Sequence, residues 1–577
     1  MAGDKALLGF WDGHDAGAAL VTSDGICCAI NEERLTRRKL EVGFPSLSVK
    51  AMLKVAAEEG LQISECAVST SDIAKTLTRY IPSLGAEYYQ LRRRKVYPGA
   101  LTSLKKRTKY WLTELPGYHW TEMLTRRILL QRLECVGLSG VPLSVVGHHH
   151  SHVAAAVMCS GYERCIGVSL DGIGDGLSGS LWLWQGGKLT PVAELSGKAS
   201  FGLFFEHVTN LLNMRELEDE GKVMALADFA YPVPDKDNPL LSFFEVSGFS
   251  LRSRYSTLRM YDELKKVLWK FPAEQFAYLA QRVLEVHVPA MIGNAVEMTG
   301  QTSVAYAGGV AANIKVNRLI RRLPEVKDLF VFPHMGDGGL AAGAALARAQ
   351  ETGFFTHPRR LQTAALAPVD KHEDQKVALA AWPEFSQHQL SDPVSSACEL
   401  LLRREVIFWF EGRMEYGPRA LGQRSILALP DSLDIKNELN LRLKRRVWYQ
   451  PFCPSMLEAD AEKLLEDYDG MVNEFMTNGY MVRPEFRGVL QGVINVDGSC
   501  RPQILPEDSV SPYAELLKKL RQETGYGVVL NTSFNLHGEP LVCSVADALR
   551  TFAETDVRFM IVSNILVEKK SCEVGQG

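Results

Sequence analysis

At 577 residues with 46% hydrophobic content, the chain is long enough for several domain-sized units with ordinary hydrophobic cores. A formal net charge of −4 gives no general reason to expect nucleic acid as a partner, and no apolar run of about 18 residues marks a signal peptide or a membrane span. The 11 cysteines form no Cys-x-x-Cys pair, which argues against a zinc knuckle or a disulfide framework and favours reduced thiols in a cytoplasmic protein.

Two predicted hairpins have acidic, glycine-rich turns. A strand over 6–10 enters the turn Trp11–Gly17, and strands over 18–22 and 26–30 follow. Later, a strand over 165–170 enters the turn Asp171–Gly176. Most such turns are only turns, but glycine lets backbone amides approach a phosphate, and an aspartate at a strand end can hold a metal. Two hairpins of this kind predict an internal duplication.

The stretch from residue 88 to 131 interleaves basic and aromatic side chains. The basic ones are at 92–95, 105–107 and 126–127, and the aromatic ones are Tyr88, Tyr89, Tyr97, Tyr110, Trp111, Tyr118 and Trp120. This composition suits anionic glycans, lipid head groups or nucleic acid. A solvated helical insertion explains it equally well.

Four histidines lie in Gly147–His152, which runs into the small-residue stretch Val153–Val157. Ala and Val at this density favour a buried helix, on which His148 and His152 stand one turn apart on the same face. Helical histidine pairs at this spacing hold divalent metals, because both imidazoles converge on one ion. The alternative is a helix start whose histidine rings are solvated.

Two glycine-containing segments downstream offer contacts for a nucleotide. Lys222 follows a glycine beside an apolar run, where its ammonium group can neutralise a phosphate or orient a substrate. A strand over 303–306 runs into a turn with Gly308, Gly309 and Asn313. Because glycines leave the backbone of a turn open, a nucleotide can lie against it. This turn is the predicted binding site for adenosine.

The order of these motifs resembles the tRNA threonylcarbamoyltransferase (Kae/TsaD-like) branch of the actin and sugar-kinase fold. The matching segments are Asp12–Ala16, the His148 and His152 pair, Asp171–Gly172, Ala307–Gly309 with Asn313, and Gly336–Gly338. The resemblance implies duplicated α/β lobes in which His148, His152 and Asp337 hold iron or a similar divalent ion, with Asp171 beside them. His149 and His150 are not implied. Imidazole with carboxylate suits Fe, Zn and other metals, so the residues alone do not choose the ion.

After residue 347 the sequence loses its periodicity, and we place a boundary near 360, which predicts domains over 1–360 and 361–577. In the second part, arginines, a lysine and small polar side chains collect on glycine-rich segments. Guanidinium forks match phosphate oxygens, so this density predicts a site for more than one phosphate. For any single arginine, a surface ion pair is the alternative.

Three segments of the second part resemble the carbamoyltransferase family that includes nodulation-type and antibiotic O-carbamoyltransferases. They are Gly417–Ser425, Asn531–Asn535 and Gly538–Pro540, together with the surroundings of Lys444 and Arg501. The resemblance covers nearly the whole chain and implies a YrdC-like α/β domain after the Kae/TsaD-like one. It further implies that ATP and carbamoyl phosphate react to carbamoyladenylate in the YrdC-like domain, with release of pyrophosphate. The metal-containing domain would then transfer the carbamoyl group to a hydroxyl.

Our hypothesis for this chemistry assigns roles to individual side chains. Those expected to clamp carbamoyl phosphate and ATP, with Mg²⁺ beside the nucleotide, are Arg419, Arg424, Lys444, Arg446 and Arg501, with hydrogen bonds from Ser533 and Asn535. His14, with Asp12 alongside, is the predicted base that takes the proton of the acceptor hydroxyl, and a structural histidine in a turn is the alternative. A homodimer is one expected assembly.

Three positions depart from the family pattern. Gln450 replaces an arginine, Val447 a glutamate and Asn495 a histidine. Loss of a cation at Gln450 is expected to weaken phosphate binding unless Arg445 substitutes for it.

Other functions stay open. Carbamoyl transfer to a protein thiol, as in hydrogenase maturation, is disfavoured because Cys-x-x-Cys pairs are missing and the first hairpin begins at Ala6. The acidic charge and the YrdC-like extension disfavour tRNA modification. A nucleotide-binding module without catalysis is supported only by Gln450 and Asn495. The acceptor can be an aminoglycoside, a polyketide, a Nod-type oligosaccharide or a lipopolysaccharide sugar. The basic and aromatic stretch leans slightly toward an anionic or glycan acceptor.

Overall fold

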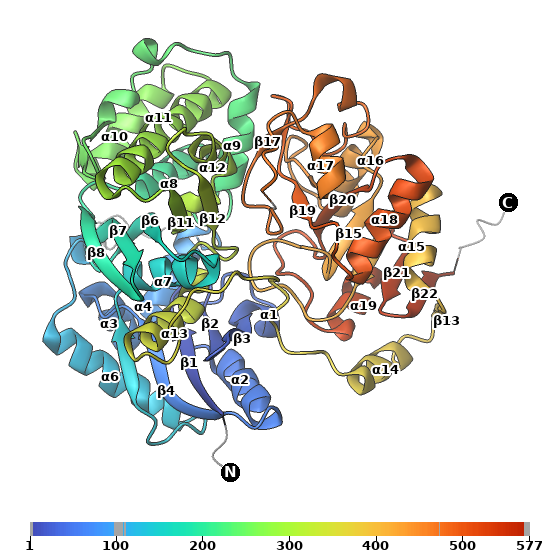
Figure 1. Ribbon diagram of the computed structural model, residues 1–577, viewed down its shortest axis with the longest axis horizontal. Coiled ribbons are helices and arrows are strands. Elements are labelled where there is room, and N and C mark those ends of the chain that lie inside the picture. The colour runs from blue at the N-terminus through green and yellow to red at the C-terminus, as the bar shows by residue number, and fades with distance from the viewer. Residues whose placement is uncertain (1–3, 97–107, 109–110, 472, 571–577) are drawn as a thin grey trace. The chain divides into compact units, whose positions relative to one another are not determined.

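The computed structural model describes residues 4–96, 108, 111–471 and 473–570 (Figure 1). Its contacts divide the chain into two compact units. Unit 1 contains Met1–Thr36 and Leu40–Gln362, and unit 2 contains Arg37–Lys39 and Thr363–Gly577. Among the described residues, no helix has both the length and the apolar character that crossing a bilayer requires.

The first half of unit 1 is built on a five-stranded sheet. In spatial order its strands are β3 (Gly25–Asn31), β2 (Gly17–Thr22), β1 (Lys5–Trp11), β4 (Gln62–Ser69) and β5 (Leu143–Val146). The hairpin strands β1, β2 and β3 are antiparallel, whereas β4 and β5 continue parallel to β1. The accompanying helices include α2 (Ser46–Glu58), α3 (Ile73–Tyr80), α4 (Pro82–Arg92) and α6 (His119–Glu134).

The second half of unit 1 repeats this sheet. Its order is β12 (Asp328–Val331), β11 (Ser303–Ala307), β6 (Cys165–Gly174), β7 (Leu177–Gln185) and β8 (Lys188–Ser196). Again the hairpin strands β6, β7 and β8 are antiparallel, and β11 and β12 run parallel to β6. Strand order and direction therefore match the first sheet throughout, which confirms the predicted duplication and the actin/sugar-kinase-like fold class.

A helical layer covers the second sheet. It consists of α8 (Phe201–Leu211), α9 (Glu220–Leu226), α10 (Thr257–Leu268), α11 (Ala273–Thr299) and α12 (Ile314–Arg321). The buried side chains of β6 and β11 share one hydrophobic cluster with those of α8 and α11. This apolar packing fixes the carboxyl ends of β6 and β11, from which two candidate site segments emerge.

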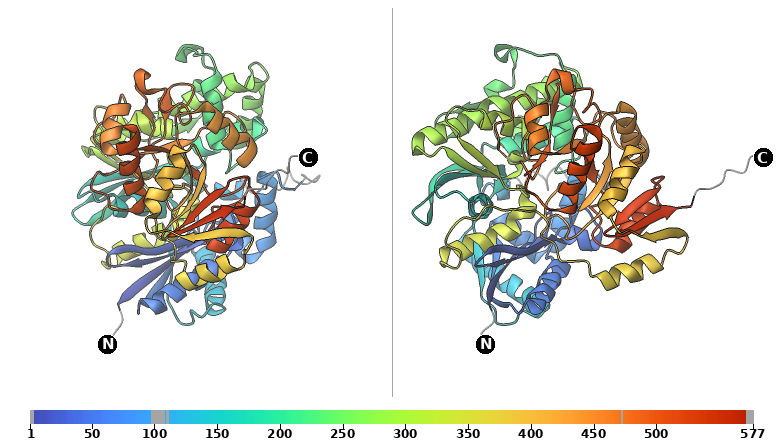
Figure 2. Two further views of the ribbon diagram at one scale, coloured as in Figure 1. Left: turned by 90° about the vertical axis from the view of Figure 1, so that its right-hand side faces the viewer. Right: turned by 45° about the vertical axis from the view of Figure 1, so that its right-hand side comes forward.

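Two helices rich in small residues lie between the sheets, α7 (His148–Ser160) and α13 (Leu340–Glu351) (Figures 1 and 2). α13 packs on β1, β2 and β4, α7 packs on β6 and β11, and the helices pack on each other. A Cβ atom at Gly343 of α13 would collide with the carbonyl oxygen of Ser151 in α7. The absence of a side chain at this position thus lets the two helix backbones touch.

Unit 2 contains an eight-stranded mixed sheet, which confirms the predicted α/β class of the C-terminal part. Its strands are β13 (Phe385–Gln389), β22 (Ile565–Lys569), β21 (Phe559–Val562), β14 (Ile407–Phe410), β15 (Arg424–Ala428), β20 (Val528–Ser533), β16 (Cys453–Leu457) and β19 (Gln503–Leu505). The accompanying helices are α14 (His372–Ala380), α15 (Pro393–Leu402), α16 (Leu433–Glu438), α17 (Glu458–Leu464), α18 (Pro512–Thr524) and α19 (Val545–Ala553). A short pair, β17 (Tyr480–Met481) and β18 (Ser499–Cys500), lies outside the main sheet.

Strand β14 shows why this sheet is buried on both faces. Phe408 and Phe410 belong to one hydrophobic cluster, whereas Ile407 and Trp409 belong to another. Successive side chains of a strand point to opposite faces, so an uninterrupted apolar run fits a strand covered on both sides.

The contact between α7 and α13 predicts a stability effect. Gly343→Ala is expected to lower the free energy of unfolding by roughly 1–3 kcal/mol, because the new methyl group meets rigid backbone. Gly221→Ala is the matched control, since nothing lies within 4 Å of its Cβ position in α9. The control is expected to be neutral or to stabilise by up to about 1 kcal/mol. Scanning calorimetry of both variants checks this, and equal melting temperatures would contradict the close-contact interpretation.

Candidate metal centre and anion site

His148 and His152 project from the first turns of α7, as their spacing predicts. The backbone N–H of His148 donates a hydrogen bond of 2.7 Å to Asp175 Oδ2, which orients the start of the helix. The two imidazole centroids are 4.8 Å apart, and both side chains are buried. One helix face thus presents two imidazoles to the same point.

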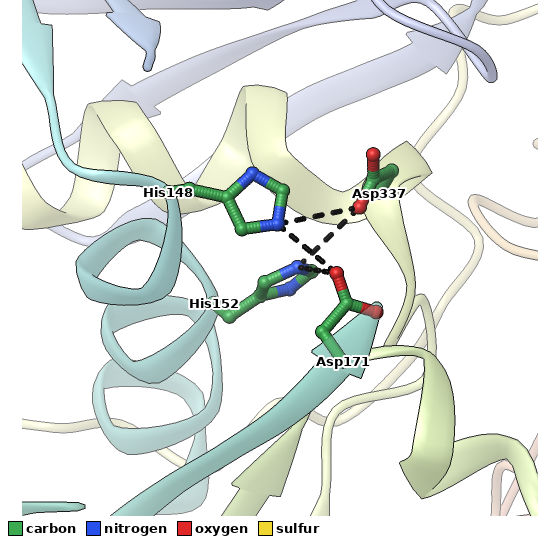
Figure 3. Close-up of side chains that lie close together, drawn as sticks. All are labelled: His148, His152, Asp171 and Asp337. Carbon is green, nitrogen blue, oxygen red and sulfur yellow. Dashed lines mark hydrogen bonds and ion pairs between the residues drawn. The ribbon is translucent and has the colours of Figure 1, made fainter. Parts of the chain in front are cut away.

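Two aspartates from distant segments complete the cluster (Figure 3). Asp171 lies in β6, and Asp337 follows β12 directly before α13. His148 Nε2 is 3.0 Å from Asp171 Oδ2 and 3.6 Å from Asp337 Oδ1, and His152 Nε2 is 3.6 and 3.5 Å from the same two atoms. One ligand atom from each of the four residues lies within 4.8 Å of the others.

The donor set suits a divalent transition metal. Nε2 of His152 is buried and has no hydrogen-bond partner, although two carboxylate oxygens are near. An ion held by two imidazole nitrogens and carboxylate oxygens would satisfy this orphaned atom. Burial opposes protonation of His148, but Asp337 and Asp171 outweigh it and raise the pKa of His148 to about 9. Metal binding at neutral pH would therefore displace protons from the cluster.

The other two histidines of the helix start serve different contacts. His149 has partners on both ring nitrogens, Ser169 Oγ and the Leu177 carbonyl, each at 3.0 Å. Burial lowers the pKa of His149 to about 3. His150 stacks on Trp182 with a centroid separation of 4.5 Å. Neither ring points into the cluster of four ligands.

His14 reaches the cluster from the first hairpin turn. Its Nε2 lies 3.1 Å from Asp337 Oδ2, and its Nδ1 lies 3.6 Å from Asp15 Oδ2. Burial disfavours the charged imidazole, but Asp337 and Asp15 outweigh it and raise the pKa of His14 to about 10. The ring of Tyr89 packs edge-on against His14 at 5.3 Å.

Asp12 is held by cations rather than by His14. Both of its oxygens accept hydrogen bonds of 2.9 Å from Arg79, and Lys75 Nζ lies 3.0 Å away. Burial works against ionisation, but these two cations hold the pKa of Asp12 well below its usual range. No local sequence pattern marks this buried triad, because Asp12 precedes Lys75 and Arg79 by more than 60 residues.

The glycine turn after β11 contacts the cluster through Asp171. The N–H of Gly309 donates a hydrogen bond of 2.7 Å to Asp171 Oδ1. Gly308 has φ +96° and would carry a Cβ into the carbonyl oxygen of Leu170. Only glycine fits there, so this turn positions a candidate ligand.

The remaining two predicted nucleotide contacts of unit 1 have protein partners. Asn313 exchanges hydrogen bonds with Gln281 and caps α12 by accepting from the N–H of Val316. Lys222 Nζ is 2.8 Å from Asp219 Oδ1.

The basic and aromatic stretch 88–131 lies partly outside the described residues, which omit 97–107 and 109–110. In the described part, Arg92 pairs with Glu206 and Glu216, and Arg93 pairs with Glu218. These two guanidinium charges are thus neutralised within the protein.

In unit 2, Lys444, Ser533 and Asn535 converge. The buried ammonium of Lys444 donates to the carbonyl oxygens of Ser533 and Asn535, and lies 2.8 Å from Asn535 Oδ1. All these acceptors are uncharged. Burial, with Arg446 and Lys39 nearby, lowers the pKa of Lys444 well below its usual value.

Arg419, Arg446 and Arg501 form a second cationic group in unit 2, around Cys453. Arg501 Nε and Nη2 lie 3.1 and 3.0 Å from Cys453 Sγ. Burial, reinforced by Arg501, lowers the pKa of Arg419 to about 9, and burial lowers that of Arg446 to about 10. Among the described residues, none of the three arginines forms an ion pair with a carboxylate. Cys453 is a component that the sequence analysis missed.

Arg424 lies elsewhere in unit 2. Its guanidinium donates to the backbone carbonyls of Glu411, Gln423 and Gly412 and stacks over the Phe410 ring. The structure therefore does not bring Arg424 into the arginine group at Cys453.

Family models match both parts of the chain. Residues 7–346 match the carbamoyltransferase N-terminus, and residues 398–569 match the carbamoyltransferase C-terminus. The chain belongs to the carbamoyltransferase family. The predicted enzyme class is thereby confirmed.

Known proteins resemble this carbamoyltransferase in sequence or in structure. Nodulation protein NolNO of Sinorhizobium fredii is 32% identical over 97% of this chain and 79% of its own length. Nodulation protein NolO of Bradyrhizobium diazoefficiens is 33% identical over 74% of this chain and 79% of its own length. Among solved structures, HypF of T. kodakarensis aligns with a TM-score of 0.32 and 14% identity, covering 61% of this chain and 49% of that chain.

The structure shows the hydrogen-bonding environment of two of the three positions that depart from the family pattern. Gln450 carries a buried Oε1 without a hydrogen-bond partner. Asn495 donates a hydrogen bond of 3.0 Å to Ser499 Oγ. Arg445, the expected substitute for the lost arginine, is exposed.

The ligand geometry predicts the metal content of variants. His152→Ala is expected to lose most bound ion, because it removes one of two imidazole ligands from a four-residue set. His150→Ala, two residues earlier in the same helix, is the control and should keep the wild-type content. Elemental analysis after loading with Fe²⁺ or Zn²⁺ and desalting measures both. Equal losses in the two variants would contradict the assigned ligands.

Proposed function

We propose that this carbamoyltransferase is an ATP-dependent O-carbamoyltransferase that works in two steps. In unit 2, hydrolysis of carbamoyl phosphate releases phosphate, and the resulting carbamate oxygen attacks the α-phosphorus of ATP and displaces pyrophosphate, which gives carbamoyladenylate. In unit 1, the acceptor hydroxyl attacks the carbamoyl carbon and displaces AMP. The observation that carries the proposal is the convergence of His148, His152, Asp171 and Asp337 within 4.8 Å. Carbamoyl transfer to a hydroxyl is helped by a Lewis acid and a general base, and a metal site beside a candidate base could supply both.

The cationic groups of unit 2 support the first step. Burying a cation without a counter-ion costs several kcal/mol, and Arg419, Arg446 and Arg501 have no carboxylate partner among the described residues. Phosphate groups of the donor and of ATP would offset this cost. Lys444, held by Ser533 and Asn535, has no carboxylate partner in the described part of the chain, so a bound phosphate would favour its protonated form. Such a preorganised positive field favours attack on the α-phosphorus, with Mg²⁺ beside the nucleotide.

The metal cluster and His14 support the second step. His148, His152 and Asp337, with Asp171, would hold a divalent ion, which we propose to be Fe²⁺. When bound, such an ion polarises the carbamoyl carbonyl as a Lewis acid. Coordination of Asp337 would also offset the carboxylate charge that keeps His14 protonated. A neutral His14 imidazole could then accept the proton of the acceptor hydroxyl, with Asp15 beside its other nitrogen.

Asp12 supports this arrangement from a distance. Its buried pairing with Arg79 and Lys75 ties the first hairpin turn to α3. Because His14 is only two residues along the same turn, we propose that Asp12 positions it.

Pyrophosphate release tests the first step. Wild-type protein is expected to release pyrophosphate from ATP only when carbamoyl phosphate is present. Arg501→Ala should reduce the rate by about 100-fold or more, the effect of losing one strong charge-stabilising group. Arg558→Ala, which removes an exposed ion pair with Glu568, is the control and should leave the rate unchanged. A coupled pyrophosphate assay measures the rate of both variants. Pyrophosphate release from ATP without carbamoyl phosphate would refute the proposed donor.

His14→Ala tests the second step separately. When preformed carbamoyladenylate reacts with water or an added alcohol, AMP is released. In His14→Ala this release is expected to slow by about 100-fold or more, as for loss of a general base. His150→Ala should keep the wild-type rate. Quenched-flow measurement of AMP reports both, and an undiminished rate in His14→Ala would remove this residue from the mechanism.

A further inference from the structure

We propose that the acceptor is an alcohol with an extended apolar body, and that it binds in a cavity of unit 1 that ends at the metal cluster. This inference rests on the proposed function, because it names the substrate of the transfer step. It follows from the shape of the cavity, from its lining and from the way the charges around it are paired.

The cavity has a volume of about 1110 Å³ and reaches the reacting groups. His148 and Asp337 are part of its wall, as are Trp11 and Tyr89 from the surroundings of His14. Pockets for drug-sized ligands usually measure about 300–1,000 Å³. The available space therefore suits an acceptor larger than a single sugar ring, with one end at the metal ligands.

Apolar side chains line part of the rest of the cavity, beside hydroxyl groups and charged side chains. They come from α3, α4 and the segment before α2, and include Ala74, Leu77, Leu84, Leu91, Val42 and Phe44. Leu77 and Leu84 are 39% and 36% exposed although they belong to this wall. Apolar surface that stays exposed in a cavity marks a place where an apolar ligand gains binding energy from burial.

Three of the four carboxyl groups of the wall have a cationic partner or a raised pKa. Asp12 pairs with Arg79 and Lys75, and Asp337 pairs with His14. Burial and the neighbouring Asp175 raise the pKa of Asp72, the N-cap of α3. A polycationic acceptor such as an aminoglycoside would therefore find few carboxylates available for its ammonium groups.

Three of the six cationic side chains of the wall are paired with carboxylates, and two of these, Lys75 and Arg79, share Asp12. Arg92 binds Glu206 and Glu216. Arg94 donates hydrogen bonds to Asn213 and to the Asn210 carbonyl. Of the basic residues at 92–95 that line the cavity, Arg92 is neutralised by carboxylates, and the guanidinium of Arg94 is engaged by uncharged acceptors. Together with the apolar surface of the wall, these contacts favour an acceptor with an uncharged body.

The test is binding of a homologous series of alkyl glucosides, from hexyl to decyl, to the metal-loaded full chain below their micelle concentrations. Isothermal calorimetry is expected to show affinity rising by up to about four-fold per added methylene, the ratio that corresponds to ~0.8 kcal/mol. Glucose and an aminoglycoside are expected to bind at least ten-fold more weakly than the decyl compound. The alkyl glucosides are then compared with unsubstituted alkanols of equal chain length. Tighter binding of the glucosides indicates a glycolipid-like acceptor, and tighter binding of the alkanols indicates a polyketide-like or simple alcohol acceptor.

Two substitutions locate the binding. Leu77→Asp and Leu84→Asp place a charge in the apolar wall without emptying a core position, and each is expected to weaken decyl glucoside binding by ten-fold or more. Leu47→Asp is the matched control, because Leu47 is similarly exposed at 42% but does not line the cavity. Its affinity should equal that of the wild type.

Affinity that does not depend on chain length would overturn the proposal, and so would equal losses in Leu77→Asp, Leu84→Asp and Leu47→Asp. Tighter binding of the aminoglycoside than of the decyl compound would also overturn it. Pyrophosphate release on the same wild-type preparation is recorded in parallel. Its absence would count against the proposed function alone, whereas the binding series would still decide the nature of the cavity.

Discussion

The direct backbone contact between α7 and α13 is the constraint on which the site of unit 1 depends. The two helices belong to different halves of a duplicated fold, and Gly343 allows their main chains to meet at Ser151. His148 and His152 stand at the start of α7, while Asp337 stands just before α13. Close packing of small residues therefore sets the separation of ligands that are almost 190 residues apart in sequence. A wider helix spacing would pull the imidazoles away from the carboxylate.

Features carried by local periodicity could be predicted from the sequence. The hairpin strands, the buried helix after Gly147 and the shared face of His148 and His152 all follow from patterns within about ten residues. Asp337 was placed in the site by resemblance, because no local pattern reports a contact between β12 and α7.

Contacts between side chains that are distant in the sequence account for the site features that could not be predicted. Asp12 was expected beside His14, yet its carboxylate is bound by Arg79 and Lys75. Arg424 shares the composition of its neighbours, but its donors are used by backbone carbonyls inside unit 2. Cys453 in β16 contacts Arg501, which lies two residues before the neighbouring strand β19, and nothing in the segment of Cys453 marks it. Residue type identifies candidates, but the partner that uses each charge depends on tertiary packing.

Buried charge is treated in two opposite ways in this carbamoyltransferase. Around the cavity of unit 1, Asp12 and Arg92 are paired with opposite charges inside the protein, and apolar surface is left for a ligand. In unit 2, Arg419, Arg446 and Arg501 surround a thiol with no carboxylate partner among the described residues, which leaves a positive field for phosphates. The first arrangement favours an uncharged acceptor and the second an anionic donor.

X-ray absorption spectroscopy of the iron-loaded protein tests the central claim most directly, because it reports the atoms around the ion. If His148, His152, Asp171 and Asp337 hold one ion, the spectrum will show a shell of nitrogen and oxygen only, with the scattering pattern of two imidazoles. A shell with sulfur, or one without imidazole scattering, would contradict the account.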